Sequence, residues 1–349
     1  MLKKHEAQGF FRKPLRHLLI LPLLVTLLLV LVLAASIGSV KIEFGEVLHT
    51  LFFSKQADPT AINYRILWRM RFPRVVAASC GGAALAVAGL LLQVLFHNPI
   101  ADPYVLGISS GARLFVGLVI LGGATFGFHS SSPWLLFTAA ALGSTASLIL
   151  MLSFAARVKS ITVLLLIGIM LGYLCNALVG VMIVFSDDIE LANFTKWTMG
   201  SFSSLGWNQA TVLLIVSLIF IGLAFLLSKP LNLMLLGESY AKTMGVNINA
   251  LRLVVVLFSG VLTAVVTAFA GLVGFIGMSV PHLARLLTRT SDNRVLLPTS
   301  ALLGAVMCTG CDLIARTIIA PSELALGTVT SFIGVPIVMS MLLKRRPIA

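Results

Sequence analysis

Few residues with reactive side chains lie inside the apolar runs of this sequence, and they limit the chemistry that the chain could perform. Cys308 and Cys311 have the C-x-x-C spacing of a redox or metal motif, but no second pair accompanies them. His282 has no further His, Cys or carboxylate at ligand spacing nearby. The sequence holds neither a Walker A motif nor H-E-x-x-H. We therefore expect no metal, no cofactor and no catalysis by this chain itself.

The arginines of the stretch RMRFPR, residues 69–74, could serve in recognition. Arginines at the mouth of an apolar segment commonly reach toward lipid headgroups. They are equally suited to bind the carboxylates of an acidic external protein. The residues alone leave both alternatives open for Arg71 and Arg74.

The elements that must hold these residues are long apolar segments. Of the 349 residues, 58% are hydrophobic and 11% are charged, and the mean hydropathy is +1.04. About 20 helical residues cross the hydrocarbon core of a bilayer. Because the runs are continuously apolar rather than alternating, they predict helices and not barrel strands. The fold class expected is an all-α polytopic membrane protein, a single transmembrane domain over 1–349.

The pattern predicts about ten transmembrane helices. Their ranges are 17–37, 74–96, 104–123, 133–156, 161–185, 208–228, 250–273, 279–289, 296–319 and 325–343. The first is expected to be an uncleaved span, because it is too long for a signal peptide and its polar flank is extended. The range 279–289 is too short to cross alone, and we expect a half-helix or tilted piece that begins at Pro281.

Lysines and arginines predict the orientation of these spans. They flank both ends of the chain and recur in the loops expected on the same side, so both termini are predicted to be cytoplasmic. The net charge of +13 follows mainly from this topology, and we expect no nucleic acid as a partner. Residues 41–74 are expected on the outer side of the membrane, yet they are rich in lysine and arginine. They depart from the rule that basic residues gather on the cytoplasmic side.

Two parts of the chain resemble each other at an offset of 178 residues. The aligned pairs are Arg74 with Arg252, Gly82 with Gly260, Ala86 with Ala264 and Pro103 with Pro281. Five predicted spans separate the copies, which gives them opposite orientations. An inverted repeat with broken helices is typical of transporters. We predict repeat one at about 71–185 and repeat two at about 250–343.

The helix breaks of the two copies are expected in two polar stretches. The first is HNPIADPYVLGISSGA, residues 97–112, and the second is GLVGFIGMSVPHLARLL, residues 271–287. Proline stops a helix. Asn98 and Asp102 are able to cap the backbone donors that such a break frees.

Arg113 follows the first break directly and is expected within or near a span. An ionisable residue inside the membrane is costly and points to function. Its partner could be Asp102, Asp312 or a carboxylate of a transported substrate. The sequence leaves these alternatives open.

The stretches 71–112, 271–287 and 322–346 together resemble the signatures of FecCD-type permeases. These are the membrane subunits of ABC importers for ferric siderophores, haem and cobalamin. The resemblance runs from about residue 65 to the C-terminus. It implies the type II ABC importer fold, with ten spans per subunit, in the inner (plasma) membrane of a bacterial cell. The partners that it implies are a second copy of the chain, two cytoplasmic ATP-binding subunits and an external substrate-binding protein.

The resemblance also implies roles for individual residues. Arg71, Arg74 and Arg316 match arginines that face outward and bind acidic residues of the binding protein. The loop 231–249 matches the coupling element that sits in the ATPase, for which the segment from Glu238 to Met244 predicts a short helix ended by glycine. The coupling contacts implied are Gly237, Glu238, Ala241, Gly245 and Val246.

Span 161–185 carries small or polar residues at every fourth position, on one helical face. The residues are Gly168, Gly172, Asn176 and Gly180. This spacing fits a close-packing face, whereas the resemblance places the span along the transport pathway at the dimer interface. The pathway residues expected are Ser160, Thr162, Gly168, Gly172, Asn176 and Arg113.

The function expected is that of an importer permease that carries an iron chelate inward. Ferric siderophore is the first expectation for its cargo, and haem or cobalamin come next. The energy would come from ATP hydrolysed by the separate subunit. The alternative is an ion-coupled secondary transporter without an ATPase, which needs buried carboxylates or histidines as relays. Only Asp312 and Asp102 are candidates for such a relay.

Overall fold

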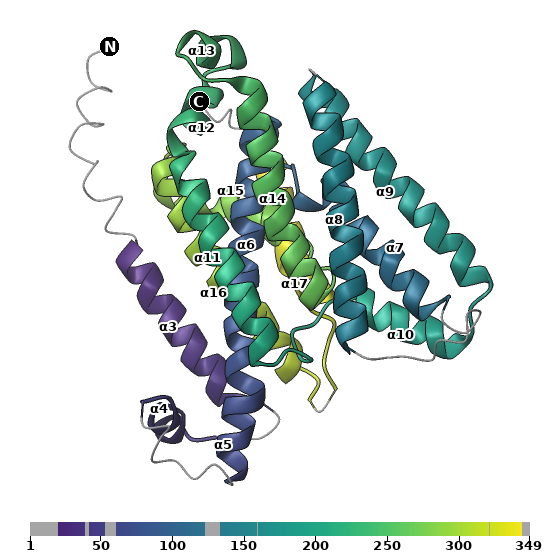
Figure 1. Ribbon diagram of the computed structural model, residues 1–349. Helices are drawn as coiled ribbons and strands as arrows, with labels where there is room; N and C mark the ends of the chain where they lie inside the picture. The colour runs from purple at the N-terminus through teal and green to yellow at the C-terminus, as the bar shows by residue number, and fades with distance from the viewer. Residues whose placement is uncertain are drawn as a thin grey trace.

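The computed structural model describes residues 20–38, 42–52, 61–122, 133–158, 160–320 and 322–343, and every regular element in these ranges is helical (Figure 1). The elements are α3 (Ile20–Ser36), α4 (Phe44–Phe52), α5 (Ile62–Ile66), η1 (Leu67–Arg71), α6 (Phe72–Leu95), η2 (Pro103–Leu106), α7 (Ile108–Ile120), α8 (Pro133–Arg157), α9 (Ile161–Val184), α10 (Asp188–Thr198), α11 (Trp207–Leu226), α12 (Ser228–Leu235), α13 (Glu238–Thr243), α14 (Ile248–Ala270), α15 (Ile276–Thr288), α16 (Asn293–Thr317) and α17 (Leu326–Leu343). The predicted all-α class is confirmed.

Among the described residues, seven helices are long and apolar enough to cross a membrane. They are Ile62–Leu95, Pro133–Arg157, Ile161–Val184, Trp207–Leu226, Ile248–Ala270, Asn293–Thr317 and Leu326–Leu343. The apolar helices α3 and α7 are shorter, at 17 and 13 residues. Most predicted ranges agree with a helix to within a few residues, but a total of ten crossings stays a prediction.

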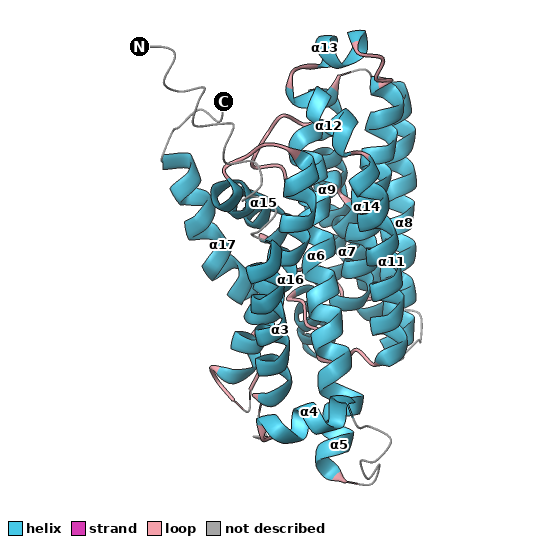
Figure 2. Cartoon of the chain, turned by 90° about the vertical axis from the view of Figure 1, so that its left-hand side faces the viewer, coloured by secondary structure: helices cyan, strands magenta, loops and turns pink. Residues whose placement is uncertain are grey.

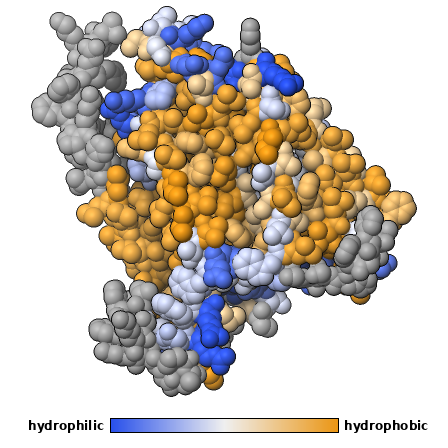
Figure 3. All heavy atoms as spheres, in the orientation of Figure 1, coloured by the Kyte–Doolittle hydropathy of each residue, from blue (hydrophilic) through white to orange (hydrophobic). Residues whose placement is uncertain are grey.

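A hydrophobic belt surrounds the middle of the molecule, and hydrophilic residues gather at its two ends (Figure 3). Large apolar side chains on several helices, such as Leu28, Ile149 and Leu218, are exposed. Such a belt suits lipid rather than water as its surroundings. Helix α13 lies at one end of the molecule, and α4 and α5 lie at the other (Figures 1 and 2).

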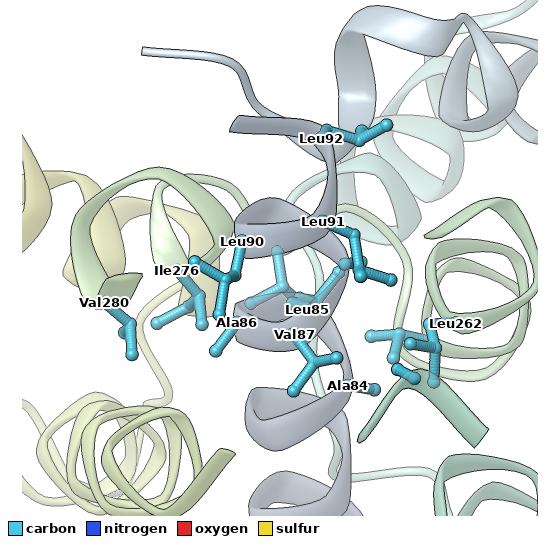
Figure 4. Close-up of a cluster of buried hydrophobic side chains, with 14 of the residues drawn as sticks. Ala84, Leu85, Ala86, Val87, Leu90, Leu91, Leu92, Leu262, Ile276 and Val280 are labelled. Atoms are coloured by element: carbon cyan, nitrogen blue, oxygen red, sulfur yellow. The ribbon is translucent and has the colours of Figure 1, made fainter. Parts of the chain in front are cut away.

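Helix α6 forms the centre of the bundle and is buried on nearly all of its faces. A helix that is apolar all round belongs in the interior. Figure 4 shows its side chains between α14 on one side and α15 on the other. The labelled residues of this cluster are Ala84, Leu85, Ala86, Val87, Leu90, Leu91, Leu92, Leu262, Ile276 and Val280.

Glycines let the backbones of this core approach closely. A Cβ atom at Gly82 would collide with the Gly304 carbonyl of α16, and one at Gly89 would collide with the Gly277 carbonyl of α15. Small residues at such crossings are the usual way in which membrane helices pack. Both contacts fix the position of α6 against the second half of the chain.

The first helix break lies where it was predicted. Asn98 Oδ1 accepts from the Ile100 N–H at 3.0 Å, and Asp102 Oδ1 accepts from the Tyr104 N–H at 2.9 Å. Gly107, at a φ of 74°, then begins α7, because a left-handed conformation suits glycine. The predicted capping by Asn98 and Asp102 is confirmed.

The second break lies within the predicted stretch 271–287, but the helix that follows it begins earlier than predicted. Helix α14 ends at Ala270, and α15 begins at Ile276, so that Pro281 lies inside α15 rather than at its start. Pro281 has no N–H and leaves the Gly277 carbonyl without its helical donor. Gln93 of α6 donates to this carbonyl instead, so the proline is tolerated. The prediction that this helix begins at Pro281 is therefore wrong.

Candidate functional site

Arg71, Arg74 and Arg316 lie together at the end of the molecule opposite α13, and all three are buried. Arg74 donates from Nε to both carboxylate oxygens of Asp312, at 3.0 and 3.1 Å. Its Nη1 and Nη2 donate to the two oxygens of Glu323, at 2.7 and 3.0 Å. Arg74 therefore binds two carboxylates of its own chain.

Arg71 and Arg316 hold the last turn of α3. The Nη1 of Arg71 donates to the carbonyls of Ala35 and Ser36, each at 2.8 Å, and the Nη2 of Arg316 donates to the carbonyl of Ala34. The Ile37 N–H donates to the carbonyl of Leu33. With this bond, all four carbonyls that a helix leaves unpaired at its C-terminus have a donor. Positive charge at that end also suits the helix dipole.

A cavity of about 240 Å³ opens beside this arginine cluster. Arg71, Arg74, Arg316 and Glu323 line it together with apolar residues and Gly38. Within the described residues, Arg74 forms ion pairs with Asp312 and Glu323, and Arg316 Nε lies 3.9 Å from Asp312. Guanidinium groups thus line an accessible cavity, where they are able to bind a carboxylate.

The two helix breaks meet in the interior. Tyr104 Oη donates to the carbonyl of Val273 at 3.1 Å and accepts from the Val273 N–H at 2.8 Å. A Cβ atom at Gly277 would collide with the ring of Pro103. The tyrosine satisfies backbone groups of the second break that helical bonding would otherwise supply. Its side chain thus ties the two breaks together.

Gln93 of α6 compensates for the proline inside α15. Pro281 has no N–H, so the carbonyl of Gly277 lacks its helical donor. The Nε2 of Gln93 donates to this carbonyl at 3.3 Å and to that of Met278 at 3.2 Å. Its Oε1 accepts from Arg285 Nη1 at 2.7 Å. Gln93 is itself buried, so these bonds lock α15 onto α6.

The small-residue face of α9 lies against η2 and α7. Gly168 packs on the carbonyl of Val105, and a Cβ atom at Gly172 would meet Ser110 Oγ at 3.4 Å. At the start of the helix, Ser160 Oγ accepts from the Val163 N–H at 3.4 Å, and Thr162 is exposed. This packing explains why α9 needs small residues there. The rest of α9 is largely exposed, so it is able to form a wall.

Arg113 of α7 lies beside this face of α9. Its Nη1 donates to Asn176 Oδ1 at 3.2 Å, and its guanidinium lies 5.5 Å from the ring centre of Phe194. Asp102 instead caps η2, and Asp312 instead pairs with Arg74. Of the three alternatives left open for the partner of Arg113, the two aspartates are therefore excluded. Within the described residues no carboxylate forms an ion pair with Arg113.

The short helix α13 lies beyond the belt at the end opposite the arginines (Figure 1). Gly237 and Gly245 flank it at φ values of 110° and 87°, which favour glycine. Ala241, within α13, is buried, and its carbonyl accepts from the Val246 N–H at 3.0 Å. Glu238 is exposed and lines a groove of about 610 Å³.

Large apolar side chains surround α13 although this end is otherwise hydrophilic. Leu236 is 65% exposed, Tyr240 49% and Met244 57%. Exposed apolar side chains that gather in one place mark a surface that contacts a protein or a membrane. The predicted short helix at Glu238–Met244 is confirmed as Glu238–Thr243.

The residues that suggested other chemistry are packed into the helices. Cys308 and Cys311 are buried free thiols of α16. His282 is buried within α15. Gly107–Gly111 has the G-x-S-x-G spacing of a serine nucleophile, but Ser109 is buried in the first turn of α7 and follows a 3-10 turn instead of a strand. In the described part of the chain, no three His, Cys, Asp or Glu side chains could hold a metal.

Broken helices that meet inside an apolar bundle, with distinct polar surfaces at its two ends, define the class of membrane transport proteins. The profile of the FecCD transport family matches residues 26–344. The chain belongs to this family, as its resemblance indicated.

Individual relatives agree with this assignment. The vitamin B12 import system permease protein BtuC of Vibrio cholerae is 38% identical over 295 residues, which are 84% of this chain and 87% of the relative. BtuC of Escherichia coli O9:H4 is 36% identical over 335 residues, covering 96% and 97%. A solved metal-chelate type ABC transporter in an inward-facing conformation has a TM-score of 0.81 at 31% identity, covering 93% of this chain and 99% of that one.

Sequence reasoning missed Gln93, Tyr104 and Glu323, which make the bonds that join distant segments. Pro281 in an otherwise helical pattern was a signal for Gln93, because a buried carbonyl without a donor must find one. Glu323 had a weaker signal, as a carboxylate directly before a predicted span. Tyr104 had none.

Proposed function

We propose that this chain is the permease subunit of an ATP-driven importer and works as a homodimer with two ATP-binding subunits. The observation that carries the proposal is the exposed apolar surface around α13, which rises beyond the belt on a short, glycine-flanked helix. A surface of this kind suits a cleft in a second protein. Its contacts would be Gly237, Glu238, Ala241, Gly245 and Val246.

The arginine cluster would receive the external binding protein at the opposite end. The chain would then cross the inner (plasma) membrane ten times with both termini in the cytoplasm. The pathway would run along α9 and α17 between two copies, past Ser160, Thr162, Asn176 and Arg113, whereas the expected pathway residues Gly168 and Gly172 pack on η2 and α7 of the same chain. Both helices expose many apolar side chains, and this supports the proposal that a second copy of the chain packs against them.

Reciprocal packing supports the proposed inverted repeat. Helix α6, the first of repeat one, packs on α16 of repeat two, whereas α14, the first of repeat two, packs on α8 of repeat one. Arg74 lies at the cluster end, and Arg252 donates to the Val158 carbonyl at 2.6 Å, near the α13 end. Such an exchange of partners is what a two-fold axis in the membrane plane produces.

The alternative of an ion-coupled transporter is less well supported. Such a protein needs carboxylates that are able to take up and release an ion. Asp312 is engaged by Arg74 and is 1% exposed, and Asp102 caps a backbone N–H. Neither candidate is free to serve as a relay.

The cargo proposed is a metal chelate. The curated relatives carry vitamin B12 in their names, and this moves cobalamin ahead of the ferric siderophore that the sequence put first, with haem third. A bulky chelate suits a pathway wall of small and weakly polar residues.

Purification of the tagged chain from its native host tests the function. We expect mass spectrometry to find a stoichiometric ATPase and a binding protein, and absorption spectroscopy to show a chelate. The Glu238→Arg variant should lose the ATPase, and the Glu46→Arg variant, changed at the other end, should keep it. A lone dimer without an ATPase would overturn the proposal and favour the secondary transporter.

A further inference from the structure

The outer side of Arg74 is already occupied by a carboxylate of the same chain, which would prevent a docking protein from binding there. Arg74 Nη1 and Nη2 donate to the two carboxylate oxygens of Glu323, at 2.7 and 3.0 Å. This bidentate arrangement is the strongest that a guanidinium forms with one carboxylate. A partner's carboxylate cannot take the same place while Glu323 remains there.

The two carboxylates on Arg74 differ in their ability to leave. The side chain of Asp312 is 1% exposed, lies within α16 and also lies 3.9 Å from Arg316 Nε. The side chain of Glu323 is 40% exposed and belongs to the connection between α16 and α17. Removal of Asp312 would leave buried positive charge without a partner, which is costly. Glu323 is able to turn into solvent at little cost.

Charge favours replacement once Glu323 has left. Of the printed ion pairs, Asp312 alone would then face the guanidinium groups of Arg74 and Arg316, beside a cavity of about 240 Å³ that opens to the surface. A desolvated cluster with this excess attracts an anionic side chain. A glutamate or aspartate of a docking protein carries the same planar carboxylate as Glu323, so it is able to form the same bidentate pair with the guanidinium.

We propose that Glu323 occupies, in the free permease, the place on Arg74 that a carboxylate of the docking partner takes, so that docking exchanges one carboxylate for another. This inference rests on the proposed docking role of the cluster. It assigns Glu323 as an internal competitor of the partner. The competitor is tied to the start of α17, because the adjacent Leu324 donates to the Ala315 carbonyl at 2.8 Å and Leu326 donates to that of Gly200 at 3.2 Å.

The first test needs no partner. The permease–ATPase complex in nanodiscs is treated with phenylglyoxal, and modification of Arg74 is followed by peptide mass spectrometry. Glu323→Gln should speed the modification about two- to fivefold, the range expected for a partly exposed ion pair. Glu323→Asp keeps the charge, and Glu46→Gln changes an acid at the same end outside the cluster; both should react like the wild type. Equal rates in Glu323→Gln and wild type would overturn the proposal.

The second test measures docking. The probe is the binding protein recovered with the tagged chain, expressed separately and immobilised for interferometry. Glu323→Gln should bind it about two- to fivefold more tightly than wild type, whereas Arg74→Ala should weaken binding. Weaker or unchanged binding by Glu323→Gln, with Arg74→Ala impaired, would overturn the exchange and leave the docking role intact. Binding that ignores Arg74→Ala would overturn the docking role and the exchange together.

Discussion

Arg113 combines a charge within the bundle with a neutral set of neighbours. Asn176 accepts one of its hydrogen bonds, Phe194 lies beside its guanidinium, and its Nε is buried without a hydrogen-bond partner among the described residues. A guanidinium retains further donors in this arrangement. It is therefore suited to an oxygen-rich or anionic group of a passing chelate.

Replacement of Arg113 by Leu should reduce uptake of the chelate recovered with the chain about tenfold or more, because a hydrogen bond to a charged group is lost. Uptake is measured in proteoliposomes that hold the complete complex. Arg113→Lys keeps the charge and should retain part of the activity. Wild-type uptake by the Leu variant would show that the cargo does not contact this residue.

Gln93 supports α15 through bonds that a proline makes necessary. Gln93→Leu should lower the free energy of unfolding by about 1–3 kcal/mol, because buried polar groups lose their partners. Pro281→Ala returns an N–H to the Gly277 carbonyl, so the double variant should lose less than the sum of the two single losses. Thermal unfolding in detergent measures this cycle. Strict additivity would contradict the pairing of Gln93 with the proline.

At the scale of elements, helices were predictable and their contacts were not. Apolar runs predicted α8, α9 and α14 closely, since crossing a membrane needs only length and hydrophobicity. The start of α15 was misplaced because the rule for proline considers one helix alone, whereas Gln93 comes from another helix. The partner of Arg113 was missed for the same reason.

The arginine cluster shows the same limit within the candidate site. The sequence predicted that Arg71, Arg74 and Arg316 belong to one end, but not that they cap α3 or bind Glu323. Such bonds join residues up to 282 positions apart. Only the packed bundle brings these groups together.

The crossing of α6 and α16 should tolerate no side chain at Gly82. Gly82→Ala should destabilise the protein by about 1–3 kcal/mol, because the new Cβ atom meets the Gly304 backbone. Gly222→Ala in α11 is the matched control, since no atom lies within 4 Å of its added Cβ. The control should be neutral or stabilising by up to about 1 kcal/mol. Equal shifts in thermal unfolding would contradict the close crossing.

At the scale of the whole molecule, the two polar ends should face opposite sides of the membrane. Ile62→Cys in α5 should react with an impermeant maleimide on intact spheroplasts, and Ser239→Cys in α13 should react only after permeabilisation. Three of the four native cysteines are buried and the fourth is half-buried, so background labelling should be low. Labelling of both variants from the same side would contradict the proposed orientation.

The contrast between α6 and α9 has a consequence for how the protein evolves. Helix α6 is buried on nearly every face and touches its neighbours backbone to backbone, so most of its positions accept few substitutions. Helix α9 packs through one narrow face and leaves the others exposed, where substitutions change folding energy little. If α9 lines the proposed pathway, new cargo preferences can therefore arise there by drift, while the same central helix is inherited unchanged.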